Sequence, residues 1–284
     1  MSAGIGCKDC VSGALHSGTP VGRTETLHGL RTYITRPLAG VEPKGVIVII
    51  PDAFGWELVN SRILADNYAQ KGQFIVYLPD FMNGHYLSEQ MLSVFNDFEL
   101  EGAYGTKILA GVKAARHFGP FFLHNRIGVV QPRILSFFDS IRADPETSGL
   151  PVGAAGFCWG GKFTAILCNS SIDGKPNTRI DAGFAAHPSQ LAIPGDIKDL
   201  IKPLSVAVGD NDLQLGAAGL DKLKKLLDAK TVQAGLKQQV VVYPGAKHGF
   251  AVRGDPADEK EKLQGMEAEE QAISWFSSTL IKVA

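Results

Sequence analysis

The sequence has little cysteine. Its four cysteines, Cys7, Cys10, Cys158 and Cys168, are too few and too unevenly spaced for a disulfide framework in a chain of 284 residues, so reduced thiols are expected. The pair Cys7-x-x-Cys10 lacks a second pair at zinc-ribbon spacing, and no strand precedes it as in thioredoxin-like motifs. We interpret it as two thiols of an N-terminal segment.

Long hydrophobic runs and an excess of one charge are also missing. No stretch of about 18 apolar residues is present, and residues 1–7 lack the basic and apolar regions of a signal peptide. These absences predict a cytoplasmic protein without membrane contact. The formal net charge of −1 and the lack of like-charge runs argue against nucleic acid as a partner. A small molecule is the expected partner, and monomer and homodimer both stay open.

What the sequence does contain is an alternation of apolar runs with helix-length stretches. The runs at 46–50 and 74–78 flank about a dozen helix-compatible residues, which predicts a βαβ unit. Further apolar runs lie at 152–157, 182–186, 204–208 and 239–243. The predicted fold class is therefore α/β, with a mostly parallel central sheet flanked by helices on both faces. No repeat or long polar linker divides the chain, which favours one domain over residues 1–284.

Several segments around this sheet have a predicted place. Ile108, Val112 and Ala115 share one face of a predicted helix, as do Ile273, Phe276 and Leu280. A further helix is predicted over 129–143, with Pro132 near its first turn. Residues 81–104 follow a strand end and are rich in aromatic residues and methionine. We expect them to overhang the site, and whether they move as a lid stays open.

The most informative segment is Gly156-x-Cys158-x-Gly160, between an apolar strand and a helical stretch. This is the pattern of a nucleophile elbow with cysteine in place of serine, because glycines two residues before and after the nucleophile let the turn close without a clash. The segment also matches the start of a phosphate-binding loop at Gly161-Lys162. That loop needs Ser or Thr directly after the lysine, where this chain has Phe163. We therefore favour a thiol nucleophile at the end of a strand.

A thiol nucleophile needs a base, and the base needs an orienting acid. Asp212 follows the apolar run 204–208, and His248 follows the run 239–243. The order Cys158, Asp212, His248 is that of α/β-hydrolases. Asp210 competes for the role of acid, but Asp212 lies deeper in the loop after the strand. His187 is the rival base; it precedes both aspartates, so we interpret it as structural or as lining the pocket.

Four motifs in order resemble the dienelactone hydrolase family, the carboxymethylenebutenolidase-like α/β-hydrolases that use a Cys-His-Asp triad. They are Ile49-Ile50-Pro51-Asp52-Ala53-Phe54-Gly55, Gly156-Phe157-Cys158-Trp159-Gly160-Gly161, Gly209-x-x-Asp212 and Tyr243-Pro244-Gly245-Ala246-Lys247-His248-Gly249-Phe250. The resemblance runs from about residue 28 to the C-terminus. Residues 1–27 form an N-terminal leader that is similar to that of fungal and other eukaryotic members.

The resemblance implies a role for each matching position. Cys158 would attack a lactone or ester carbonyl, His248 would act as base toward the thiol and then toward water, and Asp212 would orient the imidazole. The backbone N–H groups of Trp159 and Ala53 would form the oxyanion hole. The resemblance implies no metal and no organic cofactor.

The same resemblance marks further site residues and two departures. Bacterial members carry a glutamate, associated with the resting thiol and its activation, where this chain has Asp52. The family also binds a substrate carboxylate with arginines, one of them just after the catalytic histidine; here Arg253 lies one position later than that pattern. Phe54 and His187 are further candidates for substrate contact.

Two alternatives accompany the predicted lactone or ester hydrolase. A thioesterase is a variant of the same class, because a thiolate is the better leaving group. A non-catalytic or redox-sensing thiol is an alternative of a different class. Two observations argue against it. A redox thiol does not require Asp212 and His248 in this order. Cys168, ten residues after Cys158 and about 15 Å away along a regular helix, is not an obvious resolving cysteine.

Overall fold

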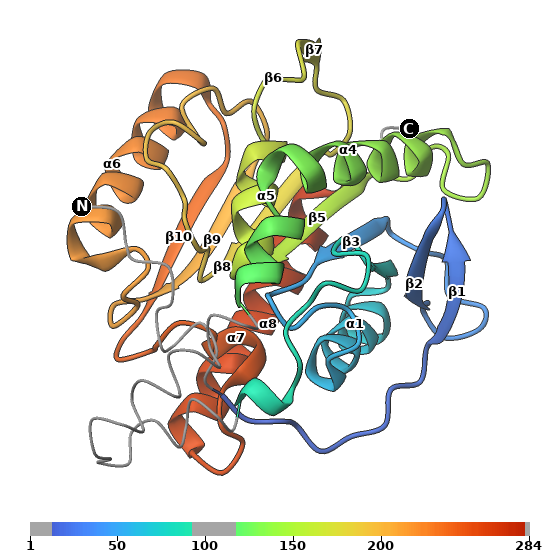
Figure 1. Cartoon of the computed structure of the whole chain (residues 1–284). Coiled ribbons are helices and arrows are strands. Elements are labelled where there is room, and N and C mark those ends of the chain that lie inside the picture. Colours follow the sequence, from blue (N-terminus) through green and yellow to red (C-terminus); the bar gives the residue numbers. More distant parts are fainter. Residues whose placement is uncertain (1–12, 93–117, 282–284) are drawn as a thin grey trace.

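An eight-stranded sheet organises the computed structural model, which describes residues 13–92 and 118–281. The strands lie in the order β1-β2-β4-β3-β5-β8-β9-β10 (Figure 1). Their bounds are β1 (Arg23–Leu27), β2 (Leu30–Thr35), β3 (Val46–Ile50), β4 (Ile75–Pro79), β5 (Val152–Phe157), β8 (Ala182–Ala186), β9 (Leu204–Gly209) and β10 (Gln238–Tyr243). The neighbours in the series β4-β3-β5-β8-β9-β10 pair in parallel, whereas β2 pairs antiparallel with both β1 and β4. The predicted α/β class is confirmed.

The helices cover both faces of this sheet. One core joins the sheet to α1 (Val59–Gly72), α7 (Phe250–Arg253) and α8 (Glu259–Thr279). The other joins it to α4 (Ile127–Ala143), α5 (Trp159–Leu167) and α6 (Gly216–Ala234). Figure 1 shows α4 and α5 in front of the sheet and α8 behind it. Because both faces are covered, the central strands β3, β5 and β9 are buried at every position, which explains their continuous apolar runs.

Two features of the chain differ from what the sequence predicts. The hairpin of β1 and β2 was not predicted; four of the five residues of β1 are exposed, so no buried face produces a hydrophobic period. The helix α4 begins at Ile127, two residues earlier than predicted, which moves Pro132 from the first turn into the second. The predicted helix around Ile108–Ala115 and residues 93–104 of the predicted overhang lie outside the described residues, as do Cys7 and Cys10.

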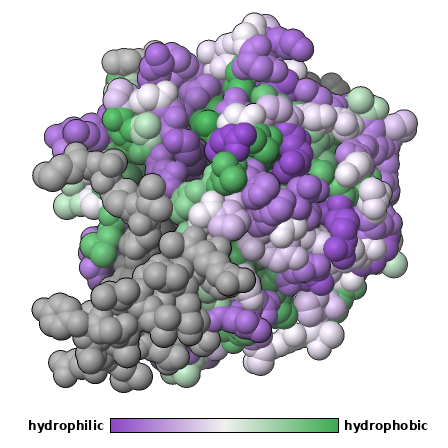
Figure 2. Space-filling model, viewed as in Figure 1, coloured by the Kyte–Doolittle hydropathy of each residue, from purple (hydrophilic) through white to green (hydrophobic). Residues whose placement is uncertain are grey.

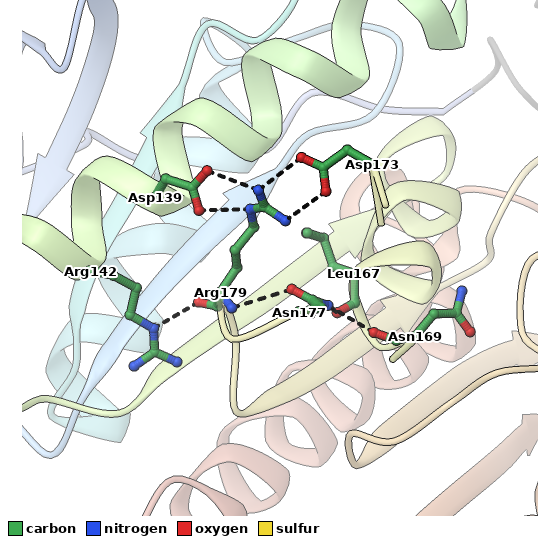
Figure 3. A network of polar contacts seen from close by, with 7 residues as sticks. All are labelled: Asp139, Arg142, Leu167, Asn169, Asp173, Asn177 and Arg179. Atoms are coloured by element: carbon green, nitrogen blue, oxygen red, sulfur yellow. Dashed lines mark hydrogen bonds and ion pairs between the residues drawn. The ribbon is translucent and has the colours of Figure 1, made fainter. Parts of the chain in front are cut away.

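A polar network fixes the far end of α5, away from the loop that precedes the helix (Figure 3). The buried guanidinium of Arg179 forms ion pairs with Asp139 on α4 and with Asp173, which lies between the short strands β6 (Ser171–Ile172) and β7 (Lys175–Pro176). Asn177, close to Arg179 in the chain, donates to the backbone oxygen of Leu167, the last residue of α5. The network therefore ties α5 to α4, and α5 is the helix that follows Cys158.

The surface does not display one large apolar region on the face seen in Figure 2, where hydrophobic residues are interspersed with hydrophilic ones outside the grey atoms. No helix among the described residues is long and apolar enough to cross a membrane.

Candidate active site

Cys158 lies on a sharp turn between β5 and α5. Its backbone has φ 51° and ψ −113°, a conformation that residues other than glycine rarely adopt. The turn needs both of its glycines: a Cβ on Gly156 would lie 2.3 Å from the backbone oxygen of Gly160, and a Cβ on Gly160 would lie 2.0 Å from that of Ile50. The local geometry is therefore that of the nucleophile elbow that the motif predicts.

His248 and Asp212 meet at the same edge of the sheet, in the loops that follow β10 and β9. His248 Nδ1 lies 2.9 Å from Oδ2 and 3.1 Å from Oδ1 of Asp212, and both side chains are buried. An Nδ1–H donated to the carboxylate leaves Nε2 to face the thiol side. The competing Asp210 accepts from the backbone N–H of Gly245 at 2.5 Å, so it ties the two loops together and is not the partner of His248.

Ser189, which no motif in the sequence marks, contacts both the thiol and the imidazole. Its Oγ is 3.0 Å from Cys158 Sγ and 3.3 Å from His248 Nε2. The residue follows β8 by three positions, at the edge where the carboxyl ends of parallel strands collect functional groups. In the sequence, the feature that could have marked Ser189 as a site residue is its place just after a predicted strand, two residues from His187.

Electrostatics in this buried cluster favour a protonated His248. Burial lowers the pKa of His248, but a negative charge on Cys158 and the hydrogen bonds to Asp212 and Cys158 outweigh it and raise that pKa to about 10. A protonated imidazole at this position would in turn stabilise a thiolate, the nucleophilic form of cysteine.

His187, the rival base, has a different environment. It is fully buried, and its Nδ1 accepts the backbone N–H of Cys158 at 3.2 Å. Its ring stands edge-on to that of His248, with 5.0 Å between the ring centroids. Burial and the neighbouring His248 hold the pKa of His187 well below its ordinary range, so the ring is neutral. It contacts the backbone of the elbow through this hydrogen bond, and its structural role stays a prediction.

Asp52 and Arg253 form a buried ion pair behind the site. Arg253 Nε donates to Oδ2 of Asp52 at 2.8 Å, and the backbone N–H of Phe54 donates to Oδ1 at 3.0 Å. Burial raises the pKa of Asp52, which is also close enough to Cys158 to feel its charge, while Arg253 opposes the rise. The guanidinium also lies over the ring of Phe54, 5.2 Å from its centroid. Contact of Arg253 or Phe54 with a substrate stays a prediction.

The surroundings of the elbow offer backbone donors and a cavity. Within the described residues, the N–H groups of Ala53 and Trp159 donate to no protein acceptor. A cavity of about 270 Å³ lies beside Trp159 and Ser189, with Phe122 and the cationic side chains of Arg126 and Lys162 among its lining. The cavity thus adjoins Ser189, whose Oγ contacts the thiol, while the role of the Ala53 and Trp159 N–H groups as oxyanion donors stays a prediction.

Three further observations concern residues that could bind a metal or phosphate, or that carry a second thiol. In the part of the chain that the structure describes, no group of three or more histidine, cysteine, aspartate or glutamate side chains could hold a metal ion. Lys162, the lysine of the phosphate-loop alternative, forms an ion pair with Asp196 at 3.0 Å. Cys168 lies buried at the opposite end of α5, where burial raises the pKa of its thiol. Burial and a raised pKa both disfavour the thiolate, the reactive form, at Cys168.

A mostly parallel sheet with covering helices, a cysteine on the elbow after β5 and a His–Asp pair on later strand ends together define an α/β-hydrolase. The sequence profile of the dienelactone hydrolase family matches residues 30–280. The chain therefore belongs to that family, as its motifs predict, and is a dienelactone hydrolase-like hydrolase.

Individual relatives agree with this assignment. The chain is 26% identical over 268 residues to hydrolase tropI of Talaromyces stipitatus, covering 94% of both chains. It is 25% identical to hydrolase pyvD of Aspergillus violaceofuscus, covering 96% of both. Among solved structures, a dienelactone hydrolase from Klebsiella pneumoniae, itself described as putative, superposes with a TM-score of 0.61 at 17% identity, covering 87% of this chain and 92% of that one. The last comparison shows a shared fold.

Proposed function

We propose that this protein hydrolyses a lactone or a small carboxylic ester, with Cys158 as the nucleophile and an acyl-thioester as the intermediate. The observation that carries the proposal is the contact chain from the strained Cys158 elbow to His248 and on to Asp212, 2.9 Å away. A buried thiolate–imidazolium pair with an orienting carboxylate is the arrangement that covalent acyl transfer requires.

Acylation uses this pair directly. The sulfur of Cys158 attacks the carbonyl carbon, and the carbonyl π-electrons move to the oxygen, which the N–H groups of Trp159 and Ala53 stabilise. When the tetrahedral intermediate collapses, the carbon–oxygen bond of the ester breaks, and Nε2–H of His248 gives its proton to the leaving alkoxide. With a lactone, that hydroxyl stays attached to the acyl group.

Deacylation reverses the roles. The neutral Nε2 of His248 takes a proton from water, whose oxygen attacks the thioester carbonyl. The carbon–sulfur bond then breaks, which releases the carboxylic acid and restores the thiolate beside the protonated imidazole. Asp212 keeps Nδ1 protonated throughout, so that Nε2 is the nitrogen that exchanges the proton.

The cavity beside the elbow supports a small substrate with an apolar part and a negative charge. Its aromatic lining, which includes Trp159 and Phe122, suits the apolar part. Of its two cations, Lys162 is already paired with Asp196, so Arg126 is the better partner for a substrate carboxylate. Arg126→Ala should then slow the hydrolysis of an anionic lactone more than that of a neutral ester.

The experiment that tests the function is turnover of p-nitrophenyl acetate and of cis- and trans-dienelactone by purified protein. Cys158→Ala and His248→Ala should each abolish turnover while circular dichroism shows an unchanged fold. Cys168→Ala is the matched control, because it removes a buried cysteine outside the site and should leave turnover intact. Full turnover by Cys158→Ala would refute the nucleophile. Absence of turnover in the wild type with a thiol that is still alkylated would favour the non-catalytic alternative.

A further inference from the structure

Two of the three residues that follow β8, His187 and Ser189, contact the polar groups of Cys158. The backbone N–H of Cys158 is shared between Nδ1 of His187 at 3.2 Å and the backbone oxygen of Ala186 at 3.1 Å, and the backbone N–H of Ser189 donates to the carbonyl oxygen of Cys158 at 2.9 Å. The Oγ of Ser189 lies 3.0 Å from Sγ. Pro188, between them, packs so tightly on α5 that a Cβ on Gly161 would lie 2.9 Å from its Cα. The segment therefore holds the strained elbow from the side of β8.

The hydroxyl of Ser189 also contacts the base. It lies 3.3 Å from His248 Nε2, so a single oxygen is within reach of both groups that exchange the proton. A hydroxyl has one proton to donate and two lone pairs to accept with. In the charged state it can donate to the thiolate while it accepts Nε2–H from the imidazolium. Both bonds are then charge-assisted, the strong kind of hydrogen bond.

We propose that Ser189 is a fourth catalytic residue, whose hydroxyl stabilises the ion pair of the Cys158 thiolate and the His248 imidazolium. Its part in turnover rests on the proposed function, but its effect on the thiol does not. The residue is buried, with 7% of its surface exposed, and its hydroxyl contacts both the sulfur of Cys158 and Nε2 of His248. The geometry therefore makes the reactivity of Cys158 depend on Ser189.

Ser189 could also be considered as the nucleophile, since it contacts His248 as well. The elbow argues against this. Cys158 is the residue that precedes the Trp159 N–H at the start of α5, and it has the strained backbone of an elbow nucleophile. Ser189 has neither feature. The two assignments make opposite predictions for Cys158→Ala, which must be inactive if the sulfur is the nucleophile.

The test measures the rate of alkylation of Cys158 by iodoacetamide across pH, with the Cys158 peptide followed by mass spectrometry so that the other cysteines do not interfere. Ser189→Ala removes only the hydroxyl and keeps the backbone N–H that donates to Cys158. Ser189→Gly removes it in a second background, should the alanine variant fail to fold. Ser189→Thr keeps a hydroxyl at a residue that lines the adjoining cavity. Ser205→Ala is the control, because Ser205 is a buried serine in β9 that bonds Gln239 and Gln271, outside the site.

Loss of one charge-assisted hydrogen bond corresponds to about a 10- to 100-fold change in an equilibrium constant. The midpoint of alkylation should therefore move up by about one to two pH units in Ser189→Ala and Ser189→Gly. Ser189→Thr and Ser205→Ala should retain the wild-type midpoint. If the alanine and glycine variants retain it as well, or if the threonine variant shifts as far as they do, the hydroxyl has no such role. Because alkylation needs no turnover, this failure is distinguishable from failure of the proposed function, which Cys158→Ala tests.

Discussion

Replacing Arg253 by methionine would leave the carboxylate of Asp52 buried without its counter-charge. In the ion pair of these two residues, 1% of the arginine side chain and none of the aspartate side chain is exposed, and 2.8 Å separates Nε from Oδ2. Methionine keeps most of the apolar volume of the arginine stem, so the change tests charge more than packing. The carboxylate would retain the N–H of Phe54 as a donor.

The magnitude follows from this burial. Removing one partner of a buried ion pair costs about 3–5 kcal/mol, because the remaining charge is left desolvated. For a chain of this size each kcal/mol corresponds to about 2–4 °C, so the melting temperature should fall by about 10 °C. The loss should depend on pH. Burial already raises the pKa of Asp52 above its ordinary 3.8, and without Arg253 it rises further.

The sign of this pH dependence follows from proton binding. Between 3.8 and the raised pKa, the folded state holds a proton at Asp52 that the unfolded state has lost, so stability falls as pH rises through this window. The deficit of Arg253→Met should therefore be larger at pH 8 than at pH 5.

The assay is urea unfolding at both pH values for Arg253→Met, Asp52→Asn and the double variant. The double variant should recover much of the loss, since the unpaired charge is gone. Arg23→Met is the control: its ion pair with Glu25 is exposed, and its loss should be below about 1 kcal/mol. A loss in Arg253→Met no larger than in this control, or one that does not change with pH, would refute the reasoning.

Three further predictions concern other parts of the molecule. Asp212→Asn should lower kcat/KM for p-nitrophenyl acetate by about 10²- to 10⁴-fold, because the amide cannot support the imidazolium of His248; a near-normal rate would remove Asp212 from the site. His187 is neutral when folded and gains a proton on unfolding below about pH 6.5, so it should reduce the free energy of unfolding by up to about 1.4 kcal/mol per pH unit as pH falls. Urea unfolding of His187→Gln between pH 5 and pH 7 should show a shallower acid slope than the wild type, and an unchanged slope would count against a buried neutral ring. Arg179→Ala should lower the free energy of unfolding by about 2 kcal/mol through its ion pair with Asp139, measured by thermal melting, while kcat stays near the wild-type value; an unchanged melting temperature would contradict this role for the network.

The parts of the fold that the sequence predicts are those with a local pattern. The strands β3, β5 and β9 are buried on both faces, so their apolar runs are continuous and their bounds are close to those predicted. The exposed strand β1 lacks such a pattern. Its partner β2 is buried over its last four residues, but the hairpin depends on the turn at His28 and Gly29, where both backbones have positive φ.

The same distinction explains which site residues the sequence reveals. The elbow around Cys158 is a short motif, and Asp212 and His248 each follow a strand, so their roles can be predicted from chain order. Ser189 belongs to no motif; its contacts with Cys158 and His248 span 31 and 59 residues and exist only once β8 lies beside β5. Asp52 and Arg253 are 201 residues apart, and no pattern in the sequence predicts that they form an ion pair.

A rapid-quench experiment with p-nitrophenyl acetate, followed by intact-mass and peptide mass spectrometry, identifies the residue that carries the acyl group. We expect an acetyl group on the Cys158 peptide of the wild type, formed within the burst of p-nitrophenol and then lost, and no acetylation of Cys158→Ala. Acetylation of Ser189 instead, or a burst that persists in Cys158→Ala, would contradict the assignment of Cys158 as the nucleophile.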